Sequence, residues 1–183
     1  MIKYTKEEAK HIWVTSDTHF NHVNIIKYCN RPFLSVEEMN EVIINNWNNV
    51  VPKEATVYHL GDFALGDKSL IPDLLNRLNG HIKFVMGNHD NYEKMINCVY
   101  SGYINSVSWE EVIKVEKKII IMNHYPFSSL PDPNSNYPTI QLHGHVHSTP
   151  DKQWSGFSNQ YDVGVDNNNF KPVNLYELIH ETL

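Results

Sequence analysis

The sequence predicts an α/β fold, because short apolar runs typical of buried strands alternate with segments of helical apolar spacing in the first half of the chain. Strands are expected at 11–15 and within 55–62 and 81–90, and helices at 35–51 and 69–80. Each expected strand runs into a polar cluster. Because the carboxyl ends of strands in an open α/β sheet share one edge, where binding sites form, the pattern also predicts the place of a site.

The two expected helices carry end signals. Ser35 and Glu38 match a capping box at the start of the first helix, and apolar residues follow at helical spacing. Ser69 is placed to cap the second helix, and Gly80 is placed to end it. Both segments are therefore expected to pack one apolar face on a sheet.

The second half of the chain predicts a different arrangement. Segment 107–127 is typical of two strands around a charged turn at 116–118, that is, a hairpin ending at His124. A loop, a strand, a short strand and a terminal helix are expected at 131–138, 139–147, 161–166 and 173–183. Since no repeat or long linker divides the chain, we expect one domain over 1–183.

The composition is that of a globular domain, with 183 residues of which 41% are hydrophobic and 20% charged. Lys and Arg number 15 against 21 Asp and Glu, which gives a net charge of −6. No basic run is long enough to follow a phosphate backbone, so extended nucleic acid is not an expected partner. The sequence carries no indication of oligomeric state.

Nothing in the sequence indicates a membrane or secreted protein. No stretch approaches the roughly 20 apolar residues of a membrane helix, and segment 1–11 lacks the apolar core of a signal peptide. We therefore expect a cytoplasmic protein. Cys29 and Cys98 lie far apart with no Cys-x-x-Cys partner, which favours reduced thiols over a disulfide or a cysteine zinc site.

The 11 histidines indicate a metal or proton-transfer site, because several follow apolar runs beside Asp, Asn or Gly. One such histidine is weak evidence, since most are hydrogen-bonded structural residues. Five clusters, each at the end of an expected strand, can converge on one edge of a layered α/β fold. They are Asp17 with His19, Gly61-Asp62, Gly87-Asn88-His89-Asp90, Asn123-His124 and Gly144-His145-Val146-His147.

The chemistry of these clusters favours two divalent first-row ions. Carboxylate, amide and imidazole without thiolate suit Mn²⁺, Fe, Zn²⁺, Co²⁺ or Ni²⁺ better than Ca²⁺, and we expect Mn²⁺. A carboxylate can bridge two ions about 3.5–4 Å apart, and such pairs clamp the oxygens of a phosphoryl displacement. Glycine before Asp62, Asn88 and His145 is expected to let the backbone bend there.

The order D-x-H, G-D, G-N-H-[DE], H, G-H-x-H resembles the pattern of the calcineurin-like metallophosphoesterase superfamily, and 20–33 resembles its small stand-alone bacterial and phage members. The resemblance implies a four-layer α/β/β/α sandwich of two mixed sheets flanked by helices, with a dinuclear centre. It also implies that His89 is no ligand but protonates the leaving oxygen, and that a hydroxide bridging the metals attacks. One ion would be held by Asp17, His19, Asp62 and His147, and the other by Asp62, Asn88, His124 and His145.

One motif departs from the protein phosphatases of this superfamily, which continue G-D as G-D-x-x-D-R. Here Leu65 and Gly66 replace the Asp that orients the catalytic histidine and the Arg that binds phosphate. Protein phosphatase activity is therefore not expected. Asp90 is the candidate to orient His89, and capping the following helix is its alternative role.

Other residues are weaker candidates. Arg31 and His22 are expected beside the site and could bind substrate, but an Arg before Pro more often makes a structural hydrogen bond. His143 could orient a ligand, and His59 reads as a structural histidine. Tyr125 and Phe127 could line the pocket, although core packing is the simpler interpretation. His11, His81 and His180 have no motif around them and are expected at the surface.

The function predicted is hydrolysis of a small phosphodiester or phosphomonoester. One alternative is a binding scaffold that has lost the chemistry, which the complete ligand set and His89 argue against. The other is a nuclease of the same superfamily, which the acidic charge and the absence of a DNA-binding extension argue against.

Overall fold

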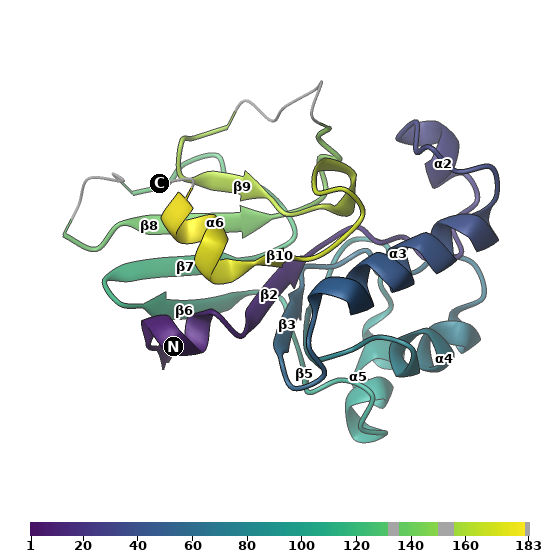
Figure 1. The fold of residues 1–183 in the computed structure, drawn as a ribbon, viewed down its shortest axis with the longest axis horizontal. Coiled ribbons are helices and arrows are strands. Elements are labelled where there is room, and N and C mark those ends of the chain that lie inside the picture. Colours follow the sequence, from purple (N-terminus) through teal and green to yellow (C-terminus); the bar gives the residue numbers. More distant parts are fainter. Residues whose placement is uncertain (132–135, 150–155, 182–183) are drawn as a thin grey trace.

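The computed structural model describes residues 1–131, 136–149 and 156–181, and it contains two five-stranded sheets with flanking helices (Figure 1). Sheet A has the order β1-β6-β7-β8-β9, and sheet B has the order β10-β2-β3-β4-β5. β6 and β7 pair antiparallel, as do β10 and β2, whereas the other neighbouring pairs are parallel. This arrangement confirms the predicted α/β sandwich of two mixed sheets.

The elements have the following bounds. Sheet A contains β1 (Ile2–Tyr4), β6 (Glu111–Val115), β7 (Lys118–Met122), β8 (Thr139–His143) and β9 (Gln160–Asp162). Sheet B contains β2 (Ile12–Thr15), β3 (Thr56–His59), β4 (His81–Val85), β5 (Ser106–Ser108) and β10 (Val173–Asn174). The α-helices are α1 (Lys6–Ala9), α2 (Ile25–Tyr28), α3 (Val36–Val50), α4 (Ile71–Asn76), α5 (Tyr92–Tyr100) and α6 (Leu175–Glu181). Short 3₁₀ helices lie at Lys68–Leu70 and Val165–Asn167.

Two buried apolar layers hold these elements together. Between the sheets, Val14 and Tyr58 of sheet B pack in one cluster with Ile120 and Leu142 of sheet A, and residues of α1 and α6 join it. A second cluster joins sheet B to α3, α4 and α5, and Trp47 is its largest fully buried side chain. Burial of one such large side chain contributes about 1.5–3 kcal/mol. These layers fix the strand ends from which the polar clusters project.

The predicted helix ends are partly corrected. Ser35 caps α3 by accepting from Glu38 N–H, but the Glu38 carboxylate accepts from Leu34 N–H, so the reciprocal bond of a capping box goes one residue further out. Ser69 does not cap α4, because it lies in the preceding 3₁₀ helix and its N–H is bound by Asp67. Gly80 (φ +97°) comes after the Arg77 C-cap and makes the turn into β4.

The predicted strand from 107 to 115 is in fact two strands in different sheets. β5 pairs with β4 in sheet B, the chain crosses at Trp109–Glu110, and β6 pairs with β1 and β7 in sheet A. The β6–β7 hairpin was predicted, whereas β1, α1 and α2 were not. The expected loop at 131–138 lies partly outside the described residues.

Among the helices the structure describes, none is long and apolar enough to cross a bilayer.

Candidate metal centre

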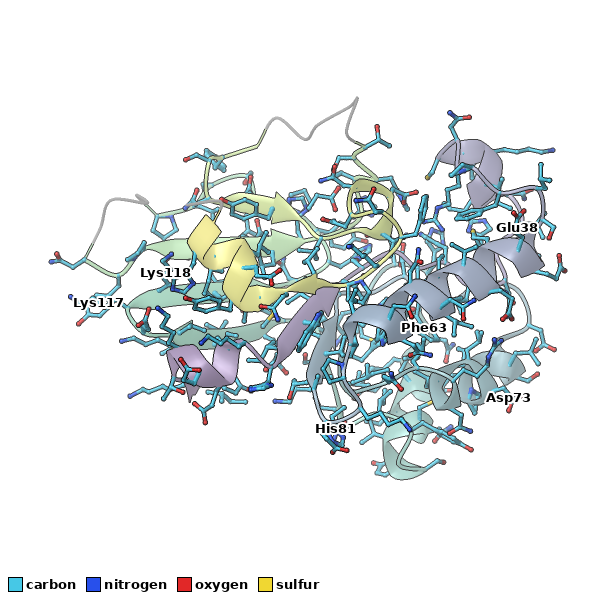
Figure 2. The ribbon with its side chains drawn as sticks, in the orientation of Figure 1. Glu38, Phe63, Asp73, His81, Lys117 and Lys118 are labelled. Carbon is cyan, nitrogen blue, oxygen red and sulfur yellow. The ribbon has the colours of Figure 1, made fainter. Side chains whose placement is uncertain are left out.

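The polar clusters come together where strands of both sheets end. β2, β3 and β4 of sheet B lead to Asp17 and His19, to Asp62, and to Asn88, whereas β7 and β8 of sheet A lead to His124 and to His145 and His147. Lys117 and Lys118, at the β6–β7 turn, mark the opposite end of sheet A (Figure 2). The edge predicted from the sequence is therefore formed by the ends of strands from both sheets.

We call Asp17, His19 and His147 the first group. The Asp17 Oδ1 atom lies 3.9 Å from His19 Nε2 and 3.8 Å from His147 Nε2. Both Asp17 Oδ1 and His19 Nε2 are buried without a hydrogen-bond partner among the described residues. A buried carboxylate oxygen facing two imidazole nitrogens without a donor is costly unless a cation joins them. Ligands about 2.0–2.2 Å from an ion stand at comparable separations, so the group fits a metal.

We call Asn88, His124 and His145 the second group. The Asn88 Oδ1 atom lies 3.0 Å from both His124 Nε2 and His145 Nδ1. Asp62 stands between the groups, because its Oδ2 is 3.5 Å from His19 Nε2 and 3.5 Å from His124 Nε2. One carboxylate oxygen facing both groups is the arrangement that a bridging ligand requires.

Hydrogen bonds from Nδ1 of His124 and His147 determine which ring nitrogen carries the proton and which carries the lone pair. His124 donates from Nδ1 to the Leu60 carbonyl at 2.8 Å, and His147 donates from Nδ1 to Asp166 Oδ2 at 2.8 Å. In each neutral ring the Nε2 atom that faces the other candidate ligands is then unprotonated, which is the form a metal needs.

Several candidate ligands lie in left-handed backbone conformation. Asp17, His19, Asp62, His145 and His147 have φ between +46° and +70°. Such a conformation costs roughly 1–2 kcal/mol in a residue with a Cβ, and it concentrates at functional sites. The fold therefore holds the backbone after these strands in an unfavourable conformation that lets the side chains converge.

The three glycines that precede candidate ligands act in two ways. At Gly61 the φ of +94° requires glycine, in agreement with the predicted bend. Gly87 and Gly144 lie instead where a Cβ would come 2.4 Å from Asp62 Oδ1 and 2.2 Å from Asp17 Oδ2, respectively, so their role is close approach of two strand ends rather than a bend. His145 N–H then donates to Asp17 Oδ2 at 2.9 Å.

Burial without a cation shifts the titration of the first group. It raises the pKa of the Asp17 carboxyl to about 6 and lowers the pKa of His19 far below its usual range. Burial also opposes the charged form of His147, but hydrogen bonds to Asp166 and Cys29 and the charges of Asp17 and Asp166 outweigh it and raise the pKa of His147 to about 11. Without an ion His147 therefore carries a second proton, on Nε2, and a metal ion bound at Nε2 would displace it.

The two groups open into a cleft of about 1200 Å³. One wall comes from α2 and the chain after it, including Ile25, Tyr28 and Pro32, and another includes Phe170. His89 lines the cleft with a side chain that is 43% exposed, and its Nε2 lies 3.9 Å from Asp62 Oδ2. Candidate ligands and a candidate proton donor therefore share one open cavity.

A calcineurin-like phosphoesterase family model matches residues 10–160, which includes every cluster described above. The chain belongs to the calcineurin-like phosphoesterase family. This confirms the resemblance stated from the motifs. Its members are hydrolases that act on phosphate esters and typically depend on two metal ions, and the clusters here provide groups that could hold metal.

One protein sequence and two solved structures are similar to this chain. An uncharacterized protein of Methanocaldococcus jannaschii, MJ1445, is 41% identical over 170 residues, covering 90% of this chain and 86% of that protein. The crystal structure of AQ665 from Aquifex aeolicus, a protein of unknown function, matches with a TM-score of 0.67 and 26% identity over 88% of this chain and 94% of that one. A structure described as a novel archaeal phosphodiesterase matches with a TM-score of 0.50 and 19% identity, covering 85% and 83%, and shares the fold.

The contacts of Arg31 in this phosphoesterase correct the expectation that it binds substrate. Nε and Nη2 donate to Asp166, Nη2 also donates to the Asp17 carbonyl, and Nη1 donates to the Thr18 carbonyl and Met39 sulfur. All five N–H donors of a guanidinium are thereby used. Arg31 is also buried, so the structural alternative describes it.

Asp90 does not cap the following helix, because Asn91 caps α5 by accepting from Lys94 N–H. The Asp90 carboxylate accepts instead from the N–H groups of Asp62, Phe63 and Gly87 at 2.8–3.1 Å. It therefore ties the end of β3 to the loop after β4. The proposed orientation of His89 by Asp90 would act through this shared loop.

His22 lies beside the first group. Its Nδ1 atom is 3.3 Å from His19 Nδ1, and its ring is 6.3 Å from that of His89. It also lines the cleft, so its place is compatible with the substrate-binding role expected from the sequence.

The remaining weak candidates divide clearly. His59 is fully buried, accepts from Gly61 N–H and contacts Thr18 Oγ1 at 3.0 Å, as expected of a structural histidine. His143 is also buried and donates to the Gly144 carbonyl, within the segment that carries His145. Tyr125 is not a core residue: it is 48% exposed, and its ring centroid is 4.6 Å from that of His145.

Two acidic residues at the site were missed by the sequence reasoning. Asp166 accepts from His147 and Arg31, and Asp162 holds the chain after His147 by accepting from Ser148 N–H and Gly164 N–H. Both belong to segment 161–166, which was predicted as a strand. The rule that polar residues at the end of a strand reach the site would have found Asp166, but not Asp162, which lies within the predicted strand.

Proposed function

We propose that this protein is a metal-dependent phosphoesterase that hydrolyses a small phosphodiester or phosphomonoester in the cleft described above. The observation that carries the proposal is the placement of Asp62 Oδ2 at 3.5 Å from a histidine of each ligand group, in a member of a phosphoesterase family. Neither a single-ion site nor a plain hydrogen-bonded core requires a carboxylate shared in this way.

Two divalent ions, most simply Mn²⁺, would be held by the two groups. When bound they would supply Lewis-acid charge for the phosphoryl oxygens and lower the pKa of a water toward ~7. The protein contributes the fixed positions of the ligands, with Asp62 common to both. The first ion would be held by Asp17, His19, Asp62 and His147, and the second ion by Asp62, Asn88, His124 and His145.

His89 is proposed to donate a proton to the leaving oxygen and to stabilise charge on the phosphoryl group. Its backbone N–H donates to Asp62 Oδ1 at 2.9 Å, while its half-exposed ring faces the cleft. The residue is thereby fixed to the shared carboxylate by its main chain, and its imidazole lines the cleft.

The cleft favours an ester whose organic part is small, uncharged and ring-shaped. Tyr28, on the α2 wall, is 74% exposed, and its ring stands perpendicular to that of His22. Arg31 has no donor to spare for a second phosphate, and the described residues lining the cleft include no Lys. An aromatic face beside an anion site suits an aryl or nucleoside ester better than a polyphosphate or a nucleic acid strand.

A direct assay tests this function. Purified protein reloaded with Mn²⁺ is expected to hydrolyse at least one of bis-p-nitrophenyl phosphate, p-nitrophenyl phosphate and the cyclic nucleotides, and Asp62→Asn is expected not to. Loss of all turnover in the wild-type protein would favour the binding scaffold. Cleavage of single-stranded DNA with Mn²⁺ would favour the nuclease.

A further inference from the structure

Arg31 and Asp166 form a bidentate ion pair beneath the first ligand group. Nε lies 2.7 Å from Asp166 Oδ1, and Nη2 lies 2.9 Å from Oδ2, across a separation of 135 residues. The two side chains are 0% and 2% exposed. The negative charge is thus buried and matched by one cation of the same protein.

Stability alone does not account for such a pair. Moving two charges out of water costs as much as their attraction returns, so an apolar pair of the same volume would serve the fold equally well. A buried bidentate pair does, however, hold both side chains in one geometry.

The remaining hydrogen bonds of the two side chains end on the first group or its backbone, apart from one to the Met39 sulfur, and the guanidinium also lies over the Phe170 ring at 5.8 Å. Asp166 Oδ2 accepts from His147 Nδ1 at 2.8 Å. Arg31 donates from Nη2 to the Asp17 carbonyl at 2.7 Å and from Nη1 to the Thr18 carbonyl at 3.0 Å. These carbonyls lie in the Asp17–His19 segment, in which Asp17 and His19 have left-handed φ.

We propose that Arg31 and Asp166 are positioning residues that set the first group for its metal ion, an inference that rests on the proposed function. Asp166 keeps the His147 proton on Nδ1, so that the Nε2 lone pair faces Asp17 Oδ1, 3.8 Å away. Arg31 anchors Asp166 and holds the strained Asp17–Thr18 backbone by its two carbonyls. The second group has no contact with this pair in the hydrogen bonds that the structure describes.

The test measures metal binding rather than hydrolysis. Apo protein is titrated with Co²⁺ by calorimetry and visible absorption, comparing wild type with Asp166→Asn and Arg31→Lys. We expect Asp166→Asn to lower the affinity for one of the two ions by roughly 10- to 100-fold and to change the absorption bands of that ion. Loss of a residue that hydrogen-bonds to a metal ligand typically lowers metal affinity by that amount. The other ion should bind as in the wild type.

Glu41→Gln is the matched control, because Glu41 pairs with Arg77 on the exposed surface of the protein. Its binding of both ions should equal that of wild type. Equal weakening of both ions in Asp166→Asn, or of neither, would overturn the inference. So would failure of both Asp166→Asn and Arg31→Lys to fold by circular dichroism, since the pair would then serve the fold.

The result also separates this inference from the proposed function. If wild-type protein binds no Co²⁺ or Mn²⁺, the proposed function fails. If wild type binds two ions and both variants do so with the same affinities, the proposed function stands and the positioning role alone is wrong.

Discussion

The two ligand groups differ in how much of their shape the protein provides before any ion binds. In the first group Asp17 and His19 are buried, and His147 is held from behind by Asp166. In the second group His124 is buried and held by the Leu60 carbonyl, but Asn88 and His145 are exposed and lie against each other. The first group therefore has more buried ligands than the second, and its half-buried ligand His147 is hydrogen-bonded to Asp166.

This difference determines the free-energy cost of binding an ion at each group. A preformed group loses little conformational freedom on binding, whereas exposed side chains must be ordered at about 0.5–1.5 kcal/mol each. The first group also keeps buried atoms without partners, so an ion there relieves a desolvation cost already present. We therefore expect the first group to bind its ion more tightly than the second.

Asp62→Asn should have the largest effect, because it removes the charge that both groups share. We expect turnover to fall by roughly 10³-fold or more and bound metal to fall well below that of wild type. Elemental analysis measures the loss. Asp73→Asn is the control, since Asp73 lies exposed on α4 (Figure 2). Retention of two ions by Asp62→Asn would contradict the bridging role.

His89→Ala should follow in size, and it separates chemistry from metal binding. Loss of a general acid lowers turnover by about 10²–10⁴-fold, while both ions should remain bound because His89 belongs to neither group. The two variants are compared in one metal analysis. If His89→Ala loses as much metal as Asp62→Asn, the division of roles is wrong.

His147→Ala and His145→Ala sharpen the comparison most directly, because they remove histidines two residues apart from different groups. We expect His145→Ala to keep one tightly bound ion and His147→Ala to lose the tighter one. Each variant should lower the affinity of its own site by more than about 100-fold, because loss of a ligand exceeds the usual effect of losing a residue that hydrogen-bonds to a ligand. Two-site calorimetry with Mn²⁺ distinguishes them. Identical binding curves would show that the groups are equivalent.

The smallest expected effect belongs to two exposed tyrosines, Tyr28 of the cleft wall and Tyr125 beside His145. Tyr28→Ala should raise KM for bis-p-nitrophenyl phosphate by a few-fold with kcat nearly unchanged, since a stacked ring contributes about 0.5–1.5 kcal/mol. Tyr125→Ala is the counterpart beside the second group, because its ring packs on His145. Metal affinity should be unaffected by Tyr28→Ala. A lower kcat with unchanged KM would exclude a stacking role for Tyr28.

Sequence reasoning succeeded for local features and for their order. The helix 35–51, the β6–β7 hairpin and the polar residues at the strand ends follow from side-chain periodicity and cap chemistry, which act over a few residues. It failed at 107–115, because a chain that crosses from one sheet to another keeps the composition of a strand on both sides. It also misjudged Tyr125, whose exposure depends on which strands lie around it.

The amino-acid order specifies the chemistry of the site: Asp, Asn and His follow one another in a fixed order, each placed where an apolar run ends. Tertiary structure alone decided which of these side chains are buried and which stay open to solvent. It also decided that Arg31 turns inward to Asp166, 135 residues away, rather than toward a phosphate. The physical reason is that ligand identity is a property of each side chain, whereas burial and ion pairing depend on partners that only the packed chain brings within reach.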